Sequence, residues 1–187
     1  MVSVREHYEN HLARYYAWIC GGAELNIAEN RNFFKTHKIQ PLETGRAFDL
    51  GAGCGFQSIP LAELGFHVIA MDLSARLLGE LKNKAAHLPI ETMCDDILNF
   101  SIYARGNIEL VVCMGDTLTH LKALQDVEAV LLQAYAALMP KGRLILSFRN
   151  LSQALEGLDR FIPVRSNDDT IFTCFLEYQK ETVRVHD

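Results

Sequence analysis

Short apolar runs typical of β-strands alternate with helix-like segments through the middle of this chain, and this alternation constrains the fold most strongly. Strands that alternate with helices favour a parallel sheet, covered by helices on both faces and joined by right-handed crossovers. The predicted fold class is therefore α/β with three layers, α/β/α. The expected strands are 47–50, 67–71, 90–94, 110–114 and 143–148, and the expected helices are 56–64, 74–86 and 127–138.

Both ends of the chain depart from this alternation. Apolar and aromatic residues recur at helical spacing between Arg5 and His37, so residues 1–40 are expected to form an N-terminal helical segment. Residues 41–187 are long enough for one further core and are predicted to form a single domain. Near the end, 171–178 and 182–186 are β-rich runs around a short polar turn, which predicts an antiparallel hairpin.

Composition excludes several classes of function. The net charge is −5 and Lys and Arg are dispersed, which disfavours a nucleic-acid partner because phosphate binding needs clustered cations. The N-terminus lacks the apolar core of a signal peptide, and no apolar run is long enough to span a membrane. We therefore expect a cytoplasmic protein with no membrane partner. The five dispersed cysteines form no Cys-x-x-Cys pair, so we expect free thiols and no metal site: Cys20, Cys54, Cys94, Cys113 and Cys174.

Three glycines and an acid lie where the first expected strand meets a helix. Gly51, Gly53 and Gly55 form Gly-x-Gly-x-Gly, with Asp49 two residues before them. Glycines at this junction allow a sharp turn and let a ligand approach the backbone closely. A dinucleotide-binding loop reads Gly-x-Gly-x-x-Gly instead. An acid at position 49 suits a ligand that carries an ammonium group and a sulfonium better than it suits a pyrophosphate.

Further acids follow the next two strands. Asp72 ends the second strand, where a carboxylate can grip a ribose diol, and Asp95 and Asp96 close the third. The carboxyl ends of parallel strands share one edge of a sheet, and open α/β sheets bind ligands there. Taken alone, Asp72 could cap the next helix and Asp95 and Asp96 could be a solvated loop.

Five segments together resemble the motifs of class I S-adenosylmethionine (SAM)-dependent methyltransferases, in the order of that family. They are FDLGAGCG, VIAMDLS, MCDDI, ELVVCMGDTLTHL and LMPKGRLILSF, within residues 47–149. The resemblance implies a Rossmann-like three-layer sandwich whose mostly parallel sheet has seven strands and ends in the antiparallel hairpin. It also implies the cofactor SAM and its product S-adenosylhomocysteine.

The resemblance assigns cofactor contacts residue by residue. Asp49 would orient the amino group of SAM, Asp72 would bind the ribose, and Asp95, with Asp96 beside it, would meet the adenine amino group. The other contacts that the resemblance implies are the glycines Gly51, Gly53 and Gly55 under the methionine part, Leu73 and Ile97 beside the adenine, and Met114 and Gly115 near the methionine part.

The loops after strands four and five are similar to those of glycine and sarcosine N-methyltransferases. His120 and Arg149 are the candidates for positioning an acceptor, with Arg149 where that subgroup binds the substrate carboxylate. The N-terminal segment contains the aromatics Tyr8, Tyr15, Tyr16 and Trp18, which could close a lid and hold a cationic amine. Tyr15 and Trp18 are the candidates for that lid. The alternatives stay open: the aromatics could belong to the core, and Arg149 could pair with a loop acid.

The end of the chain departs from the family pattern. Members of this fold have a helix between strands five and six and insert the last strand between them. Here Leu151 to Phe161 is the one stretch left for that helix, and the last strand is short. Either the sheet is a minimal version, or residues are missing and a second subunit, as in a homodimer, covers its edge.

The function that follows is transfer of a methyl group from SAM to a small-molecule acceptor, most plausibly an amine, by direct in-line displacement. Two alternatives remain: a SAM-binding or sensing protein without catalysis, and an NAD-dependent oxidoreductase, which the spacing of the glycines disfavours. The identity of the acceptor is not encoded in any motif that we recognise.

Overall fold

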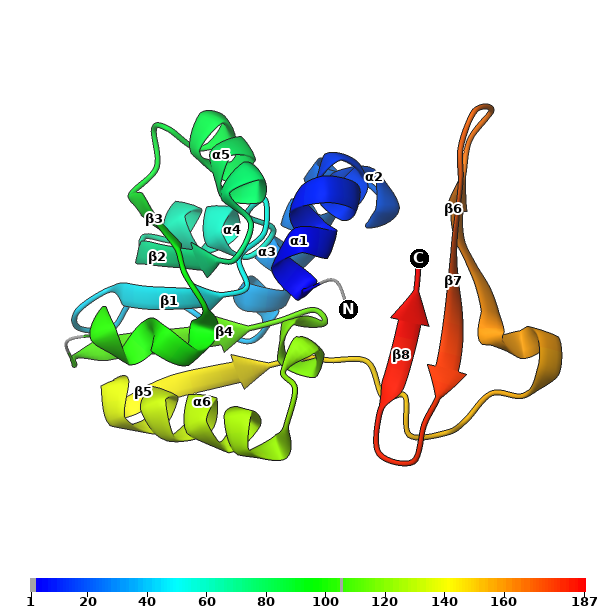
Figure 1. Ribbon diagram of the computed structural model, residues 1–187. Helices are drawn as coiled ribbons and strands as arrows, with labels where there is room; N and C mark the ends of the chain where they lie inside the picture. The colour runs from blue at the N-terminus through cyan, green and yellow to red at the C-terminus, as the bar shows by residue number, and fades with distance from the viewer. Residues whose placement is uncertain (1–2, 105) are drawn as a thin grey trace.

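The computed structural model describes residues 3–104 and 106–187, and a parallel sheet forms its centre (Figure 1). The strand order is β3-β2-β1-β4-β5, so the chain runs outward from β1 to β3 and then returns to the other side of β1. The carboxyl ends of β1 and β4 therefore form a switch point, where ligands bind in open α/β sheets. The strands are β1 (Arg46–Leu50), β2 (His67–Asp72), β3 (Ile90–Cys94), β4 (Ile108–Cys113) and β5 (Leu138–Leu146).

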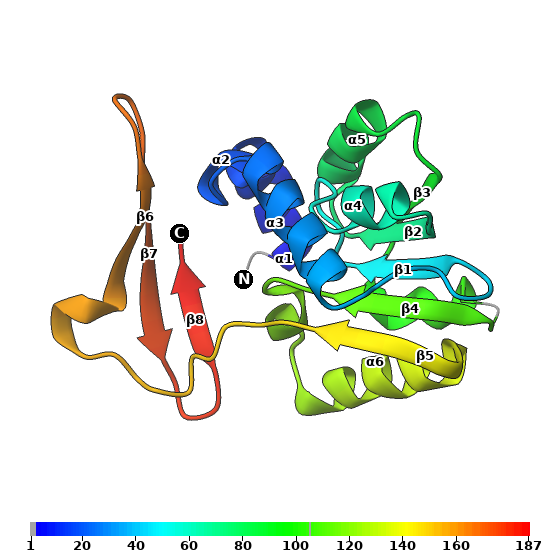
Figure 2. The same cartoon turned by 180° about the vertical axis from the view of Figure 1, so that it is seen from behind.

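Helices cover both faces of this sheet and confirm the three-layer α/β sandwich. One face packs on α3, α4 and α5, and the other on α6 and the 3₁₀ turn η3, as Figures 1 and 2 show from opposite sides. The two-residue period of β1 explains the division, since Ala47 and Phe48 face opposite layers. The bounds are α3 (Ala23–Thr36), α4 (Ser58–Glu63), α5 (Ala75–Lys84), η3 (Ile97–Ile102) and α6 (Leu124–Ala137).

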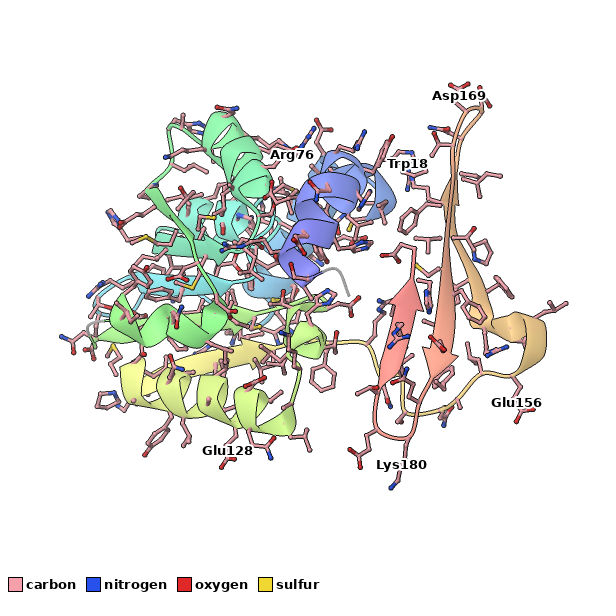
Figure 3. All side chains as sticks on the ribbon, in the orientation of Figure 1. Trp18, Arg76, Glu128, Glu156, Asp169 and Lys180 are labelled. Carbon is pink, nitrogen blue, oxygen red and sulfur yellow. The ribbon has the colours of Figure 1, made fainter. Side chains whose placement is uncertain are left out.

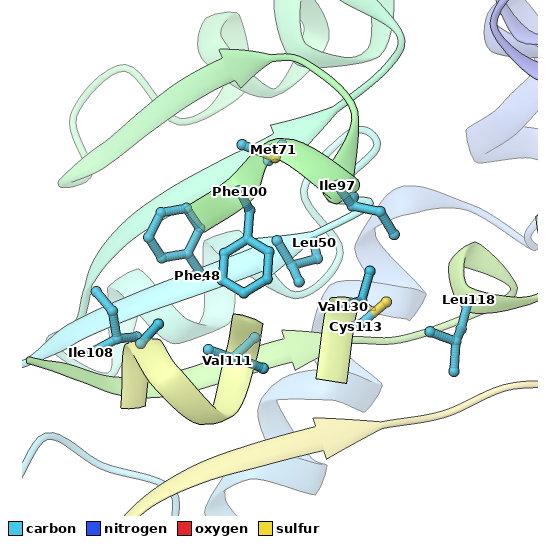
Figure 4. Close-up of a cluster of buried hydrophobic side chains, with 12 residues drawn as sticks. Phe48, Leu50, Met71, Ile97, Phe100, Ile108, Val111, Cys113, Leu118 and Val130 are labelled. Carbon is cyan, nitrogen blue, oxygen red and sulfur yellow. The ribbon is translucent and has the colours of Figure 1, made fainter. Parts of the chain in front are cut away.

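The core between the sheet, η3 and α6 contains two aromatic rings at its centre. Phe48 and Phe100 are fully buried, with ring centroids 5.7 Å apart (Figure 4). Met71 and Val130 close the cluster from β2 and α6. All six residues of β4 are buried, and five of them are apolar, because a central parallel strand is covered on both faces. The exception in sequence is Glu109, near the start of the strand.

The N-terminal segment is helical but irregular. It consists of α1 (Val4–His7), the π-helical turn η1 (Tyr8–Leu12), the 3₁₀ turn η2 (Ala13–Tyr15) and α2 (Tyr16–Ile19). Gly21 and Gly22, with φ angles of 96° and 113°, then turn the chain into α3. The domain boundary expected at residue 40 stays a prediction.

The expected seven-stranded sheet is wrong. The structure has a five-stranded parallel sheet and a separate antiparallel sheet in the order β6-β7-β8. The hairpin expected near the end is present as β7 (Ile171–Tyr178) and β8 (Val183–His186), but it pairs with β6 (Phe161–Ser166). The helix considered for 151–161 is replaced by the 3₁₀ turn η5 (Gly157–Arg160).

The antiparallel strands form a sheet of their own because the chain makes a second hairpin, between β6 and β7. The side chain of Asn167 accepts the backbone N–H groups of Asp169 and Thr170, and this Asx turn reverses the chain between β6 and β7. Asp169 lies at the tip of that hairpin in Figure 3. With β6 on one side and β8 on the other, β7 has no free edge to offer the parallel sheet.

The antiparallel sheet β6-β7-β8, the small sheet, lies beyond the carboxyl ends of the parallel strands, and β4 and β5 point toward it (Figures 1 and 2). Its contacts with the N-terminal helices include the Arg165 guanidinium, 5.7 Å from the Trp18 ring centre, and an Asp187 carboxylate oxygen, 2.9 Å from His7 Nε2. Within the described residues every helix is too short or too polar to cross a lipid bilayer.

Candidate active site at the carboxyl edge of the parallel sheet

A cavity of about 450 Å³ opens where the parallel strands end. Its floor comes from the loops after β1, β2, β3 and β4, and its roof from the N-terminal helical segment, through residues such as Arg5, Tyr8 and Tyr16. This volume is typical of pockets for small ligands. The cavity therefore lies at the switch point that the strand order creates.

The three glycines of the loop after β1 have different neighbours. A side chain at Gly51 would collide with Thr117, because an added Cβ would overlap Thr117 Oγ1. At Gly53 the φ angle is 52° and an added Cβ would lie 3.3 Å from the Tyr16 ring. Gly51 and Gly53 line the cavity, whereas Gly55 packs against Leu81 of α5. Gly55 is not among the residues that line the cavity, and its contact with the methionine part stays a prediction.

Asp72 lines the cavity from the end of β2. Its carboxylate accepts the N–H of Gly53 and that of Ser74, each at 2.8 Å, so it joins the glycine loop to the start of α5. Desolvation raises its pKa, against the effect of these two hydrogen bonds. A carboxylate has about four lone-pair positions, so two stay available to a ligand.

Asp49 lies beneath the glycine loop and is buried. Its Oδ2 accepts a hydrogen bond from the Ser58 hydroxyl at 2.6 Å, and its Oδ1 has no partner among the described residues. Burial raises the pKa of this carboxyl to about 7. Asp49 does not line the cavity itself. A buried carboxylate oxygen without a donor is a place where a ligand ammonium group or a bridging water would be favoured.

The two acids after β3 are used differently. Asp96 lines the cavity with Ile97 and caps η3 by accepting the Leu98 N–H. Asp95 turns away, where it accepts hydrogen bonds from the Tyr103 hydroxyl and the Asn99 amide. The structure therefore brings Asp96, and not Asp95, to the cavity, and the adenine contact stays a prediction. Leu73 lines the same region from the end of β2.

The loop after β4 lines the cavity with residues that follow Met114 and Gly115 in the sequence. Met114 is half-buried against the core, and the Gly115 N–H is bonded to the Ser147 hydroxyl. Neither lines the cavity, which is instead reached by Thr117 and His120 of the 3₁₀ turn η4 (Thr117–His120).

In this structure Arg149 pairs with a loop acid, which is the alternative to carboxylate binding that the sequence left open. Its Nε lies 2.6 Å from a carboxylate oxygen of Asp116, and it is not part of the cavity wall. The pair is near enough to His120 for both charges to influence that imidazole. An acceptor carboxylate would have to compete with Asp116 for Arg149.

The aromatic residues of the roof are Tyr8 and Tyr16, two of the four aromatics of the N-terminal segment, and not the lid candidates Tyr15 and Trp18. Tyr15 is 45% exposed, and Trp18 faces Arg165 of β6 (Figure 3). Tyr16 stacks on Phe56 at 5.7 Å, and Tyr8 reaches His120. The π-helical and 3₁₀ turns between residues 8 and 15 change the helical phase, so spacing at 3.6 residues per turn could not identify this face.

Comparison with known families matches residues 47–142 to the methyltransferase domain. That match covers half of the sequence and spans the loops that line the cavity floor. The chain belongs to the methyltransferase domain family. The resemblance to class I SAM-dependent methyltransferases seen in its motifs is thereby confirmed.

Curated relatives of this methyltransferase domain include glycine/sarcosine N-methyltransferases. The protein of Halorhodospira halochloris is 32% identical over 133 residues, covering 69% of this chain and 49% of the relative. That of Parasynechococcus marenigrum is 36% identical over 113 residues, covering 58% and 39%. The chain thus spans about half the length, or less, of these two relatives.

Solved structures share the fold of this methyltransferase domain. A SAM-dependent methyltransferase from Clostridium acetobutylicum has a TM-score of 0.71 at 21% identity, over 84% of this chain and 65% of that one. Magnesium protoporphyrin IX methyltransferase from Synechocystis, solved with bound SAM, has a TM-score of 0.62 at 20% identity, over 97% and 92%. At these identities the likeness establishes the architecture alone.

Proposed function

We propose that this methyltransferase domain binds SAM in the cavity and transfers its methyl group to a small-molecule amine. The observation that carries the proposal is the floor of the cavity. Gly51 and Gly53 leave the backbone bare, and Asp72 presents unused lone pairs beside them at the switch point of the sheet. A cofactor with a ribose and a positively charged methionine part fits such a floor.

The residues present fit the parts of SAM in order along the edge. Asp72 would accept hydrogen bonds from the ribose hydroxyls, and Asp96 with Ile97 and Leu73 would hold the adenine. Asp49, with its unpartnered Oδ1, would favour the ammonium end, directly or through water. When bound, SAM supplies an activated methyl group on a sulfonium.

The protein's own part in the reaction is to position the acceptor and exclude water. Tyr8 and Tyr16 form a roof over the glycine loop, and Thr117 and His120 form the wall at the end of β4. Holding two reactants in line can lower a barrier by about 7–11 kcal/mol in favourable cases. A covalent nucleophile is not needed for a one-step displacement.

The choice of an amine is supported by the curated relatives, which are named for N-methylation of glycine and sarcosine. Arg149 is near enough for its charge to influence the His120 imidazole, so its guanidinium could receive an acceptor carboxylate beside that residue. Its ion pair with Asp116 would have to open, and an acceptor with both an ammonium and a carboxylate group could replace each partner. Because this chain spans only part of its relatives, the acceptor stays part of the proposal.

Calorimetry with SAM and S-adenosylhomocysteine, followed by an assay of S-adenosylhomocysteine release with glycine and sarcosine, tests the proposal. We expect binding of both nucleosides, and Asp72→Ala should weaken it by about 1–3 kcal/mol through lost ribose hydrogen bonds. Absence of heat from the folded protein would contradict the proposal. Binding without turnover on a broad amine panel would favour a SAM-sensing role, and tighter binding of NADH would favour a dehydrogenase.

A further inference from the structure

Tyr8 and His120 meet across the cavity, although they come from opposite parts of the domain. Tyr8 belongs to η1 in the roof and His120 to η4 in the wall, and both line the cavity. Tyr8 Oη lies 3.2 Å from His120 Nε2, and the two rings meet edge to face with centroids 5.6 Å apart. The contact joins the N-terminal segment to the loop that follows β4.

The surroundings favour the uncharged form of both groups. Desolvation, reinforced by Asp72 and Asp116, raises the pKa of Tyr8. The His120 side chain is exposed, but the atoms packed around it desolvate the imidazole and lower its pKa. The charged and titratable groups around the pair are Asp72, Asp116, Asp187, Cys20, Arg149, His7 and Tyr16, and Arg5, Asp96, Lys122 and Asp126 line the same cavity.

In these uncharged states the Tyr8 hydroxyl can donate to His120 Nε2, with the ring proton on Nδ1. Transfer of the Tyr8 hydroxyl proton to His120 requires this tautomer. The oxygen of Tyr8 then has lone pairs left for a hydrogen-bond donor in the cavity. An amine with an N–H group is such a donor.

We propose that Tyr8 and His120 together accept the proton of an amine acceptor. Tyr8 Oη takes a proton from the ammonium nitrogen while the Tyr8 hydroxyl proton passes to His120 Nε2. The nitrogen now has the lone pair that forms the bond to the methyl carbon, and the carbon–sulfur bond breaks with its electrons left on sulfur. His120 later releases the proton to water. This inference rests on the proposed function.

Two of the three aspartates that line the cavity already accept backbone hydrogen bonds, and the third, Asp126, lies in the first turn of α6. Asp72 holds two backbone N–H groups of the glycine loop and α5, and Asp96 caps η3. Among the described residues that line the cavity, His120 is the one imidazole. Tyr8 and His120 are also joined directly, so a proton can pass between them without a bridging water.

Rates with amines of different basicity test the proposal in the complete chain. His120→Asn and Tyr8→Phe should each lower kcat/KM for glycine or sarcosine at pH 7 by about 100-fold or more, as expected for loss of acid–base catalysis. The loss should shrink as the pH rises toward the pKa of the acceptor amine, because a growing fraction of the acceptor is then already neutral. It should be small throughout for methoxyamine, which is already neutral at pH 7. A loss that is equal at every pH and for every amine would overturn the proposal.

Matched controls use the same substitutions elsewhere. Tyr135 of α6 is 82% exposed and His87 lies on the surface after α5, so Tyr135→Phe and His87→Asn should keep wild-type rates. Calorimetry should give the same SAM affinity for all four variants, which separates a defect in proton transfer from one in cofactor binding.

Nitrogen-15 NMR of the imidazoles provides a readout without turnover. In the wild-type protein His120 should carry its proton on Nδ1, and Tyr8→Phe should release Nε2 and move the tautomer balance. A wild-type His120 protonated on Nε2 would overturn the proposal even if a variant failed to fold.

The outcomes distinguish a failure of the proposed function from a failure of the proposed role of Tyr8 and His120. Absence of SAM binding contradicts the proposed function. SAM binding with wild-type amine rates in His120→Asn and Tyr8→Phe contradicts the Tyr8–His120 pair alone. SAM binding with no amine methylated also overturns the pair's role, while the cofactor site stands.

Discussion

At the residue scale, two adjacent aspartates after β3 show how one position decides a role. Asp96 faces the cavity and caps η3, whereas Asp95 is engaged by Tyr103 and Asn99. Neighbouring residues in a loop point in different directions, so an acidic pair in the sequence does not reveal which member reaches a ligand.

Serine substitutions can separate these two aspartates. Asp96→Ser keeps an N-cap side chain for η3 but withdraws the carboxylate, so SAM affinity should fall by about 1–2 kcal/mol. Asp95→Ser should leave SAM affinity unchanged. Calorimetry of both variants with SAM checks this expectation, and the reverse pattern would return the adenine contact to Asp95.

Asp49 makes stability depend on pH. Because burial raises its pKa to about 7, the folded protein holds this proton over a range in which the unfolded chain has lost it. This group therefore stabilises the fold least above pH 7, and its contribution grows as the pH falls from about 7 to 4. Asp49→Asn should remove that slope and raise the unfolding free energy at pH 8 by up to about 4 kcal/mol. Denaturant unfolding of both proteins at pH 5 and pH 8 measures the difference, and parallel pH profiles would contradict it.

At the element scale, the loop before β1 is organised by one carboxylate from β4. Glu109 is buried and accepts the backbone N–H groups of Leu42, Glu43, Thr44 and Gly45. Burial works to raise the pKa of Glu109, but these donors hold it below its ordinary value. The carboxylate thereby aligns the start of β1 with β4 and, through β1, the glycine loop.

Glu109→Gln should destabilise the domain. The amide can accept at one atom only and brings two donors toward four backbone donors, so we expect a loss of about 2–4 kcal/mol. The wild-type contribution is present above about pH 4.5 and is lost as the pH falls through the lowered pKa, so the two proteins should converge in acid. Denaturant unfolding at pH 7 and pH 3.5 tests this, and equal stability at pH 7 would contradict it.

At the scale of the whole molecule, the small sheet and the N-terminal helices are linked to each other. Arg165 of β6 lies over Trp18, and Asp187 contacts His7. Residues 147–156 connect the small sheet to β5 and form neither helix nor strand. The cavity roof is therefore continuous with the small sheet, and movement of one is expected to involve the other.

Arg165→Ala should loosen that link. A cation–π contact at an exposed site is worth about 0.5–1 kcal/mol, so amide exchange in β6 and α2 should rise by roughly two- to fivefold. Exchange in β1 and β4 should not change. Arg184→Ala, which removes an ion pair within the small sheet, is the matched control, and unchanged exchange in α2 of Arg165→Ala would contradict the link.

The sequence by itself determined the parallel sheet, its covered faces and the cavity floor. Periodicity and glycine spacing are local properties, and the carboxyl ends of parallel strands necessarily share an edge, so Gly51, Gly53 and Asp72 could be brought together from the chain alone. The cofactor class followed from the joint order of the motifs.

Tertiary structure alone decided the small sheet and the roof. The pairing of β6 with β7 depended on a turn at Asn167 that competes with a helical alternative, and pairing between strands is not written in the period of either strand. Tyr8 and Tyr16 replaced Tyr15 and Trp18 because η1 and η2 shift the helical phase. The contact between Tyr8 and His120 joins residues 112 positions apart, and only packing could bring them together.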